Sequence, residues 1–452
     1  MTFDRLSPLD GRYTEAAAPL TDYFSEFAFL RDRVRVELDF LSALSKTDLV
    51  RPLTDAESAR LNPIKSNFSL ADAESILEYE RKTRHDVKAI EYFIQSKLQD
   101  TSLKDLISWI HFGLTSEDTN SIGQAIALKE SRDKLILPAF DNLLRALCDF
   151  AIDNRTIPML ARTHGQLAVP TTLGKEFAVY VARLDQVCRK IYAYNFEAKL
   201  TGAVGNFNAL QAAAPQIDWL DFSEAFIVSF DLEPNLITTQ ILPYDNWVRY
   251  FDLIRLTNSI MIDFAQDIWR YISVGYLKQT LVEAEVGSSP MPQKVNPIHF
   301  ENAEGNLGIA NAMFSHYAQK LTISRLQRDL SDSTVRRTFG TALGHTLLAW
   351  SNLTRGLKHV APDEEKIKAD LYAHWEVVSE GAQTILRAAG KADAYESLKQ
   401  KTRGRVLTKA DYESWCNAID IDDRTRARLK KLSPETYIGL AIELTDRGVL
   451  RG

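Results

Sequence analysis

The sequence predicts an all-α fold: a bundle of long helices with smaller helical regions at both ends. Apolar residues recur at helical spacing over two unusually long segments, from Thr172 to Leu200 and from Trp247 to Leu277. Helices of this length are about twice the mean or more and are typical of bundles. Alternating runs that would indicate strands are nearly absent. We therefore expect an N-terminal helical domain (1–105), a central long-helix bundle (106–357) and a C-terminal helical domain (358–452).

The N-terminal region reads as short helices separated by turns. Apolar side chains from Ser25 to Ala43 predict a helix, and the break at Asn62-Pro63 predicts the end of another. Before the first of these helices, the turn Asp10-Gly11-Arg12-Tyr13 places a guanidinium beside an aromatic ring. On its own, this turn is equally typical of a solvated loop.

Two polar stretches follow. In the first, Arg84 and Asp86 flank His85, a residue that titrates near neutrality, although a histidine on such a helix is often structural. In the second, Thr115 and Asp118 have the spacing of a capping box and predict a helix start. The exposed N–H groups there suit a carboxylate or phosphate, but capping alone also explains these residues.

His164 lies between two long helical patterns. Pro158 and Pro170 bracket it and Gly165 follows it, so we expect irregular backbone, where functional groups are commonly displayed. A catalytic role and an ordinary loop role both fit this observation.

A proline-rich loop occupies residues 287–302. Its prolines at 290, 292 and 297 exclude a helix, and Ser288 and Ser289 stand close to Lys294 and Asn296. Hydroxyls beside a cation and an amide could handle an anion or stabilise an alkoxide. The alternative is a surface connection with incidental serines.

Composition narrows the class of partner. The chain has 452 residues, 45% of them hydrophobic, and a formal net charge of −6, which argues against a nucleic-acid partner. No apolar run approaches the length of about 20 residues that spans a bilayer, so we expect a cytoplasmic protein without membrane partners. Three dispersed cysteines make a disulfide framework or metal site unexpected.

The loop also carries a family resemblance. From Gly287 to Pro297 the chain reads Gly-Ser-Ser-Pro-Met-Pro-Gln-Lys-Val-Asn-Pro. This segment resembles the signature of the fumarase/aspartase superfamily, whose members cleave a C–N or C–O bond and release fumarate. The segments that narrow the resemblance to the adenylosuccinate lyase family are Asp10–Tyr13, Arg84–Lys88, Thr115–Asp118, Arg162–Gln166, Pro170–Glu176 and Arg328–Arg337.

The resemblance implies a β-elimination that converts adenylosuccinate to AMP and fumarate, and the succinyl-carboxamide ribotide SAICAR to AICAR and fumarate. The Cβ–H beside a carboxylate is a weak acid, so the reaction needs a base and a site that stabilises the carbanion. By resemblance Ser288 is that base and His164 is the acid that protonates the departing nitrogen. Lys294 and Asn296 would hold the carboxylate, and His85 would orient or charge the site.

The same resemblance implies the substrate contacts. They are Arg12, Tyr13, Arg84, His85, Asp86, Thr115, Ser116, Gln240, Ser289, Lys294, Val295, Asn296, Asn302, Arg328, Ser333, Thr334, Val335, Arg336 and Arg337. It also implies no metal or organic cofactor, and a homotetramer whose composite sites draw on three chains. Apolar residues on further faces of the long helices, including Tyr180, Val248 and Met261, suggest the same assembly.

Two alternatives remain open at this stage. The first is argininosuccinate lyase, which has glutamine where Gln293 stands, a position that is usually histidine in adenylosuccinate lyases. The segment from Arg162 to Gln166 opposes this alternative. The second alternative is a catalytically silent structural protein, because a lens crystallin was recruited from this superfamily. The intact Ser288, Lys294 and His164 weigh against it.

Overall fold

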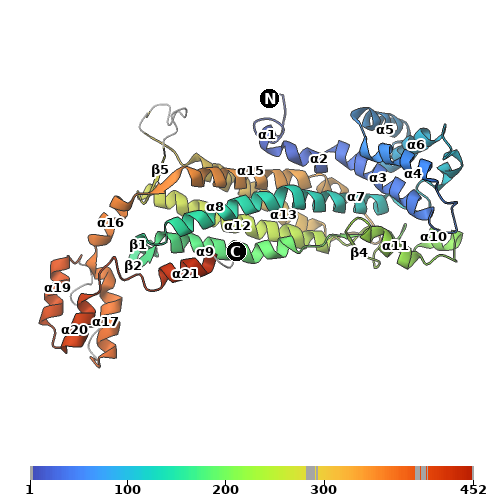
Figure 1. Cartoon of the computed structure of the whole chain (residues 1–452). Coiled ribbons are helices and arrows are strands. Elements are labelled where there is room, and N and C mark those ends of the chain that lie inside the picture. The colour runs from blue at the N-terminus through green and yellow to red at the C-terminus, as the bar shows by residue number, and fades with distance from the viewer. Residues whose placement is uncertain are drawn as a thin grey trace. The chain divides into compact units, whose positions relative to one another are not determined.

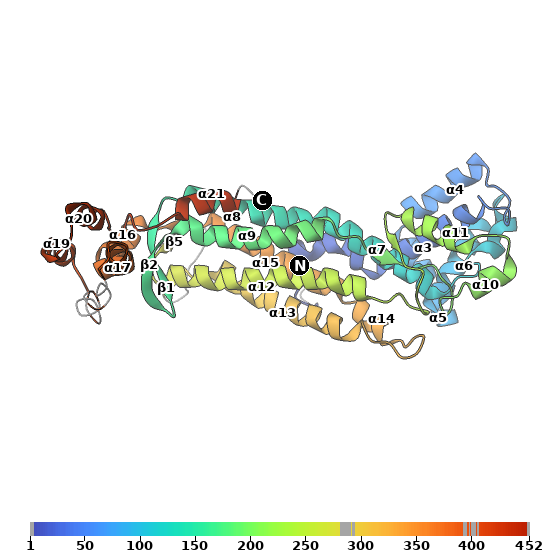
Figure 2. The ribbon, with the colours of Figure 1, turned by 90° about the horizontal axis from the view of Figure 1, so that it is seen from below.

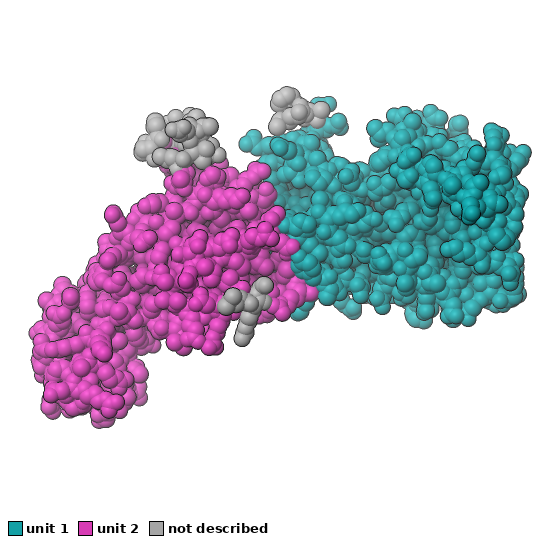
Figure 3. All heavy atoms as spheres, viewed as in Figure 1, with its two compact units in different colours: residues 1–139, 190–258, 306–348 teal, residues 140–189, 259–305, 349–452 magenta. Residues whose placement is uncertain are grey.

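The computed structural model describes residues 4–280, 291, 294–391, 396, 398, 404 and 406–449, and helices make up most of this chain (Figure 1). It divides into two compact units, each built from three segments (Figure 3). Unit 1 comprises residues 1–139, 190–258 and 306–348, and unit 2 comprises 140–189, 259–305 and 349–452. This division follows contacts rather than chain order, so the three consecutive domains expected from the sequence stay a prediction.

The chain passes from one unit to the other within its long helices. These helices are α8 (Leu137–Asp153), α9 (Leu173–Tyr192), α12 (Asp245–Ser273), α13 (Ile298–Lys320) and α15 (Phe339–Lys358). Within each unit, the parts of these helices run side by side in both views of the ribbon (Figures 1 and 2). The long-helix bundle predicted by the apolar periodicity is thereby confirmed.

The remaining elements are shorter. Those of unit 1 are α1 (Thr14–Ala17), η1 (Ala18–Leu20), α2 (Thr21–Phe24), α3 (Glu26–Leu44), α4 (Asp55–Ser66), α5 (Leu70–Thr83), α6 (Asp86–Leu98), η2 (Lys104–Trp109), α7 (Ser116–Ser131), η3 (Arg132–Ile136), β3 (Glu197–Ala198), α10 (Asn208–Ala213), α11 (Trp219–Val228), β4 (Glu233–Pro234) and α14 (Ser331–Arg336). Those of unit 2 are β1 (Pro158–Thr163), β2 (Gln166–Thr172), β5 (Leu277–Gln279), β6 (Val360–Pro362), α16 (Glu364–Tyr372), η4 (Trp375–Val378), α17 (Ser379–Ala388), α19 (Lys409–Ala418), α20 (Asp423–Lys430) and α21 (Ala441–Val449).

Aromatic side chains fill the bundle within each unit. In unit 1, the Phe251 ring of α12 lies 5.5 Å from Phe314 of α13 and 4.7 Å from Phe339 of α15. In unit 2, Phe140 of α8 meets Trp350 of α15 edge-on at 5.4 Å. Such pairs add to the burial of large apolar surface, so the aromatic residues fix how the helices pack.

The N-terminal helix prediction is confirmed. Helix α3 begins at Glu26, because the Ser25 hydroxyl oxygen accepts the Ala28 N–H at 3.1 Å and caps the first turn. The predicted break at Asn62-Pro63 is wrong, since α4 continues through Pro63 to Ser66. Pro63 is exposed, so water can satisfy the carbonyl group that lacks its helical donor.

The long segments end earlier than predicted. Helix α9 stops at Tyr192 rather than at Leu200, because the chain then pairs Glu197 with Glu233 in a short parallel sheet. Helix α12 stops at Ser273, just before Gly275, whose φ of 78° is left-handed.

Three of the apolar residues predicted to face outward are buried within the chain. Tyr180 and Val248 are each 8% exposed and Met261 is fully covered. Other apolar side chains of the long helices are exposed instead, among them Leu256 and Trp269. Among the described residues, none of the helices is long and apolar enough to cross a membrane.

Strands occur where the sequence suggested irregular backbone. β1 and β2 form an antiparallel hairpin in which Thr163 pairs with Gln166. The two residues of its turn, His164 and Gly165, both have positive φ, 52° and 73°. Positive φ at both central positions is the geometry of the tight turn that matches strand twist. His164 therefore stands at the tip of a hairpin.

Gly174 offers a test of packing in unit 2. A Cβ at this position would lie 2.2 Å from the Ala151 carbonyl oxygen and 2.6 Å from the Arg155 backbone. We expect Gly174→Ala to destabilise the protein by about 3 kcal/mol, because backbone must move. Urea unfolding followed by circular dichroism measures this cost.

Gly123→Ala is the matched control. It also adds a methyl group inside a helix, but the nearest atom, the Asp32 Cβ, is at an ordinary 3.6 Å. This variant should be neutral or gain up to about 1 kcal/mol from helix propensity. Equal losses in both variants would contradict the packing around Gly174.

Candidate active site

A polar cavity of about 360 Å³ lies in unit 1. It is formed by segments far apart in the sequence, and its lining residues are Phe29, Arg33, His85, Asp86, Thr115, Ser116, Asn120, Gln124, Gln240, Arg328, Leu330, Ser333, Arg336 and Arg337. The sequence-predicted substrate contacts that meet here are His85, Asp86, Thr115, Ser116, Gln240, Arg328, Ser333, Arg336 and Arg337. Four guanidinium groups make this cavity suited to an anionic ligand.

The junction between α5 and α6 forms one edge of the cavity. Arg84 ends α5 in a left-handed conformation, with φ of 55°, and turns the chain. His85 then caps α6: its Nδ1 accepts the Lys88 N–H at 3.2 Å. The neutral ring therefore carries its proton on Nε2, which leaves an N–H donor on a side chain that is 56% exposed.

The start of α7 forms a second edge. The carboxylate of Asp118 accepts the Thr115 N–H at 2.9 Å, which confirms the predicted capping box. The same carboxylate pairs with the buried Lys199 ammonium at 2.8 Å and accepts the backbone N–H of Thr201. These bonds hold the helix start rigidly, so Thr115 and Ser116 face the cavity from a fixed position.

A buried charge network lies beneath the cavity. The fully buried Glu117 carboxylate pairs with Arg336 at 3.0 Å and with Arg328 at 3.1 Å. Arg336 also pairs with Asp332 at 3.0 Å, and the Tyr244 hydroxyl donates to Asp332 at 3.0 Å. Burial raises the pKa of Glu117, but the two guanidiniums outweigh it and lower that pKa to about 2.

Arg328 and Gln240 close the cavity from a third side. The Arg328 guanidinium donates to the Gln240 side-chain oxygen at 3.3 Å, while the Gln240 backbone N–H donates to the Gln327 carbonyl. Arg328 remains partly exposed at 20%, so its guanidinium is accessible to a ligand.

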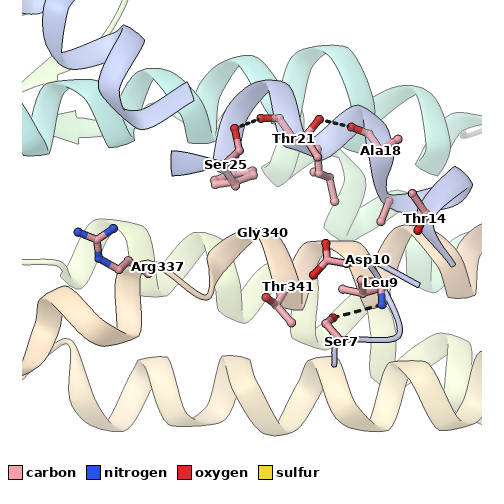
Figure 4. Close-up of a pocket in the computed structure, with 13 residues that line it drawn as sticks. Ser7, Leu9, Asp10, Thr14, Ala18, Thr21, Ser25, Arg337, Gly340 and Thr341 are labelled. Carbon is pink, nitrogen blue, oxygen red and sulfur yellow. Dashed lines mark hydrogen bonds between the residues drawn. The ribbon is translucent and has the colours of Figure 1, made fainter. Parts of the chain in front are cut away.

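Arg337 links this cavity to a second, mainly apolar hollow of about 230 Å³ in the same unit (Figure 4). Its guanidinium forms an ion pair with Glu26 at the start of α3. The hollow is bordered by Asp10, which belongs to the turn that carries Arg12 and Tyr13. Arg12 is exposed there, and Tyr13 is the residue that precedes α1.

Several predicted residues lie elsewhere. In α14, Thr334 is exposed and Val335 is partly buried, and neither lines the cavity. His164, at the exposed hairpin tip, belongs to unit 2. Ser288 and Ser289 lie outside the described residues.

The described end of the proline-rich loop also belongs to unit 2. Lys294 is exposed, and the carbonyl oxygen of Val295 accepts a bond from Gln279 at 2.9 Å. Asn296 is partly buried. The loop ends earlier than the predicted residue 302, because α13 begins at Ile298, directly after Pro297. Asn302 therefore lies in the first part of α13, where it accepts a bond from the Asn352 amide at 2.7 Å.

Sequence reasoning missed five lining residues. They are Phe29, Arg33, Asn120, Gln124 and Leu330. A signal existed for Arg33, because a cation beside Leu30 and Val34 on the apolar face of a helix must find a buried partner. No comparable signal marks Asn120 or Gln124, since the arginines that bond to them, Arg33 and Arg336, come from distant segments.

The fold recurs in solved structures. The 3-carboxy-cis,cis-muconate lactonizing enzyme from Pseudomonas putida superposes with a TM-score of 0.76 at 17% identity, covering 96% of each chain. A fumarate lyase from Mesorhizobium sp. BNC1 also gives 0.76, at 15% identity, covering 96% of this chain and 97% of that one. A family model described as "Lyase" matches residues 11–312. The family model thus defines a lyase, and its fold is the fumarase/aspartase architecture.

Closer relatives specify the family. The adenylosuccinate lyase of Haemophilus influenzae is 44% identical over 450 residues, covering 99% of both chains. That of Escherichia coli K12 is 41% identical and that of Dictyostelium discoideum 43%, covering 98% and 96% of this chain and the same shares of theirs. A second family model, "Adenylosuccinate lyase C-terminal", matches residues 324–438. The chain belongs to the adenylosuccinate lyase family.

The Glu117 network predicts a stability effect. Glu117→Gln removes the negative charge that Arg328 and Arg336 share, and leaves the buried Arg336 and the partly exposed Arg328 undercompensated. We expect a loss of about 3 kcal/mol at neutral pH, measured by urea unfolding. The matched control is Glu443→Gln, which breaks an exposed pair with Arg447 and should change little.

The loss of stability in Glu117→Gln should depend on pH. Because the folded pKa of Glu117 is lowered, to about 2, its contribution is fully present above the unfolded value of about 4.3 and disappears as pH falls toward 2. The difference between wild type and Glu117→Gln should therefore shrink between pH 5 and pH 3. A constant difference over this range would contradict an ionised, paired Glu117.

Proposed function

We propose that the protein is an adenylosuccinate lyase that cleaves adenylosuccinate to AMP and fumarate and SAICAR to AICAR and fumarate. One observation carries the proposal beyond family membership: four separate segments bring His85, Thr115, Gln240 and Arg328 to one cationic cavity. Both substrates carry a phosphate and two carboxylates, so their charge matches this cavity. A cytoplasmic location stays part of the proposal.

The reaction requires two proton transfers at opposite ends of the bond that breaks. We assign removal of the Cβ proton to Ser288 and protonation of the departing nitrogen to His164. A serine becomes a base only where its alkoxide is stabilised, a task for the nearby Lys294 ammonium in the sequence. As negative charge flows into the substrate carboxylate, Lys294 and Asn296 would stabilise it.

The cavity would bind the nucleotide part of the substrate. Its guanidiniums and the hydroxyls of Thr115 and Ser116 suit a phosphate. The start of α7 adds to this, because it presents N-terminal N–H groups and the positive end of the helix dipole there. The exposed Nε2–H of His85 adds a hydrogen-bond donor. We place the remaining predicted contacts, from Arg12 and Arg84 to Asn302, around the same substrate.

We further propose a homotetramer with composite sites. Exposed apolar residues on the long helices support it: Leu256 is 47% exposed, Trp269 45% and Ile309 50%. On α13, Gly305 and Gly308 have no heavy atom within 4 Å of the position that a Cβ would take, which leaves room for another helix backbone. Apolar surface of this kind on long helices is typical of subunit interfaces.

The direct test of activity is an ultraviolet assay for loss of adenylosuccinate, with AMP and fumarate identified by chromatography. Ser288→Ala and His164→Ala should each lower kcat by about 10² or more, with smaller changes in KM. Ser58→Ala, on an exposed part of α4, is the control and should retain wild-type activity.

Each outcome has a separate meaning. Wild-type turnover in either active-site variant would remove that residue from the proton transfers. Cleavage of argininosuccinate in place of adenylosuccinate would overturn the assigned substrate.

Assembly is tested by light scattering at micromolar concentration, where we expect the mass of four chains. Ile309→Glu places a charge in the proposed interface and should reduce the mass. Leu70→Glu alters an apolar residue of the short helix α5 that is even more exposed, 71%, and should leave the mass unchanged. A monomeric wild type would refute the tetramer and the composite sites together.

A further inference from the structure

Arg33 is a charged residue inside the structure. Its side chain is 2% exposed on α3, with the guanidinium 3.7 Å from the centre of the Phe29 ring one turn earlier. Burial disfavours its charged form and lowers its pKa, although the Asp86 carboxylate opposes this effect. A buried cation of this kind persists only where directed partners compensate it.

Two such partners come from different helices. The Arg33 Nη2 group donates to the Asp86 carboxylate at 2.8 Å, and its Nε donates to the Asn120 side-chain oxygen at 2.8 Å. Asp86 is the first residue of α6, and Asn120 lies in the first turns of α7. One planar guanidinium therefore ties two cavity edges to α3.

Each partner of Arg33 makes a further hydrogen bond of its own. The other oxygen of Asp86 accepts the Val87 N–H at 2.9 Å, so Arg33 fixes the first turn of α6 next to His85. The Asn120 amide group donates to Glu117 at 2.7 Å, which connects Arg33 to the buried charge network. The His85 edge and the Arg328 edge are thus joined through Arg33.

We propose that Arg33 is a positioning residue of the active site, acting through Asp86 and Asn120 to hold His85 and the start of α7 toward the substrate. This inference rests on the proposed function. Lysine cannot replace arginine here, because a single ammonium lacks the planar fork that reaches both acceptors in fixed directions.

The test compares Arg33→Lys with wild type in the adenylosuccinate assay. The loss of one charge-assisted hydrogen bond should raise KM by about tenfold or more, while kcat changes less. Arg31→Lys is the matched control. It also alters a partly buried arginine of α3, which bonds to Asp32 and does not line the cavity, and KM should stay within about twofold because no cavity contact changes.

A double-mutant cycle separates positioning from general destabilisation. If Arg33 acts in part through Asp86, then Arg33→Lys combined with Asp86→Asn should raise KM by less than the product of the two single effects. Additive effects, or an unchanged KM in Arg33→Lys, would overturn the proposal while the lyase function stands.

A second measurement does not depend on turnover. Amide hydrogen exchange at residues 84–90 should be faster in Arg33→Lys than in Arg31→Lys, because the first turn of α6 loses its anchor. Equal exchange would overturn the inference. A wild type that does not cleave adenylosuccinate would overturn the proposed function instead, and the exchange comparison would still decide whether Arg33 anchors α6.

Discussion

The candidate site depends on the compensation of charge at Glu117. This carboxylate is fully buried and shared by Arg328 and Arg336, which reach it from a segment more than two hundred positions later in the chain. Removing such a charge from water is tolerated only when its partners are fixed. The start of α7 and the segment that carries α14 must therefore stay together. The cavity lies between these two segments, because neither can move without leaving Glu117 or its arginine partners unpaired.

Local patterns in the sequence predicted the parts of the fold that local physics determines. Apolar periodicity identified α3, α9 and α12, and the Thr115–Asp118 spacing identified the start of α7, because helix formation and capping involve residues three or four apart. The predicted ends of α4, α9 and α12 were wrong. Helix α9 stops where a pairing with a distant strand begins, and α4 continues through Pro63 because that position is exposed to water.

The site was only partly predictable for the same reason. Motifs matched to the family gave His85, Thr115, Gln240 and Arg328, and the cavity brings these together. Arg33 and Asn120 were missed because their importance comes from a bond across 87 positions of sequence, which no local spacing reveals. The hairpin at His164 was missed because its strands lack clear alternation, and only the paired backbone shows that the histidine occupies a turn.

The pairing of every guanidinium in the cavity constrains how an anion can bind. Arg33 and Arg336 are almost fully buried and each already has a carboxylate partner, so redirecting either would leave a buried negative charge unpaired. Arg337 differs, because both it and its partner Glu26 are substantially exposed, 42% and 65%. Water can solvate Glu26 when a ligand anion takes its place, so this exchange costs little. The buried arginines therefore shape the cavity, and the exposed Arg337 is the cation most able to exchange its carboxylate partner for a ligand anion.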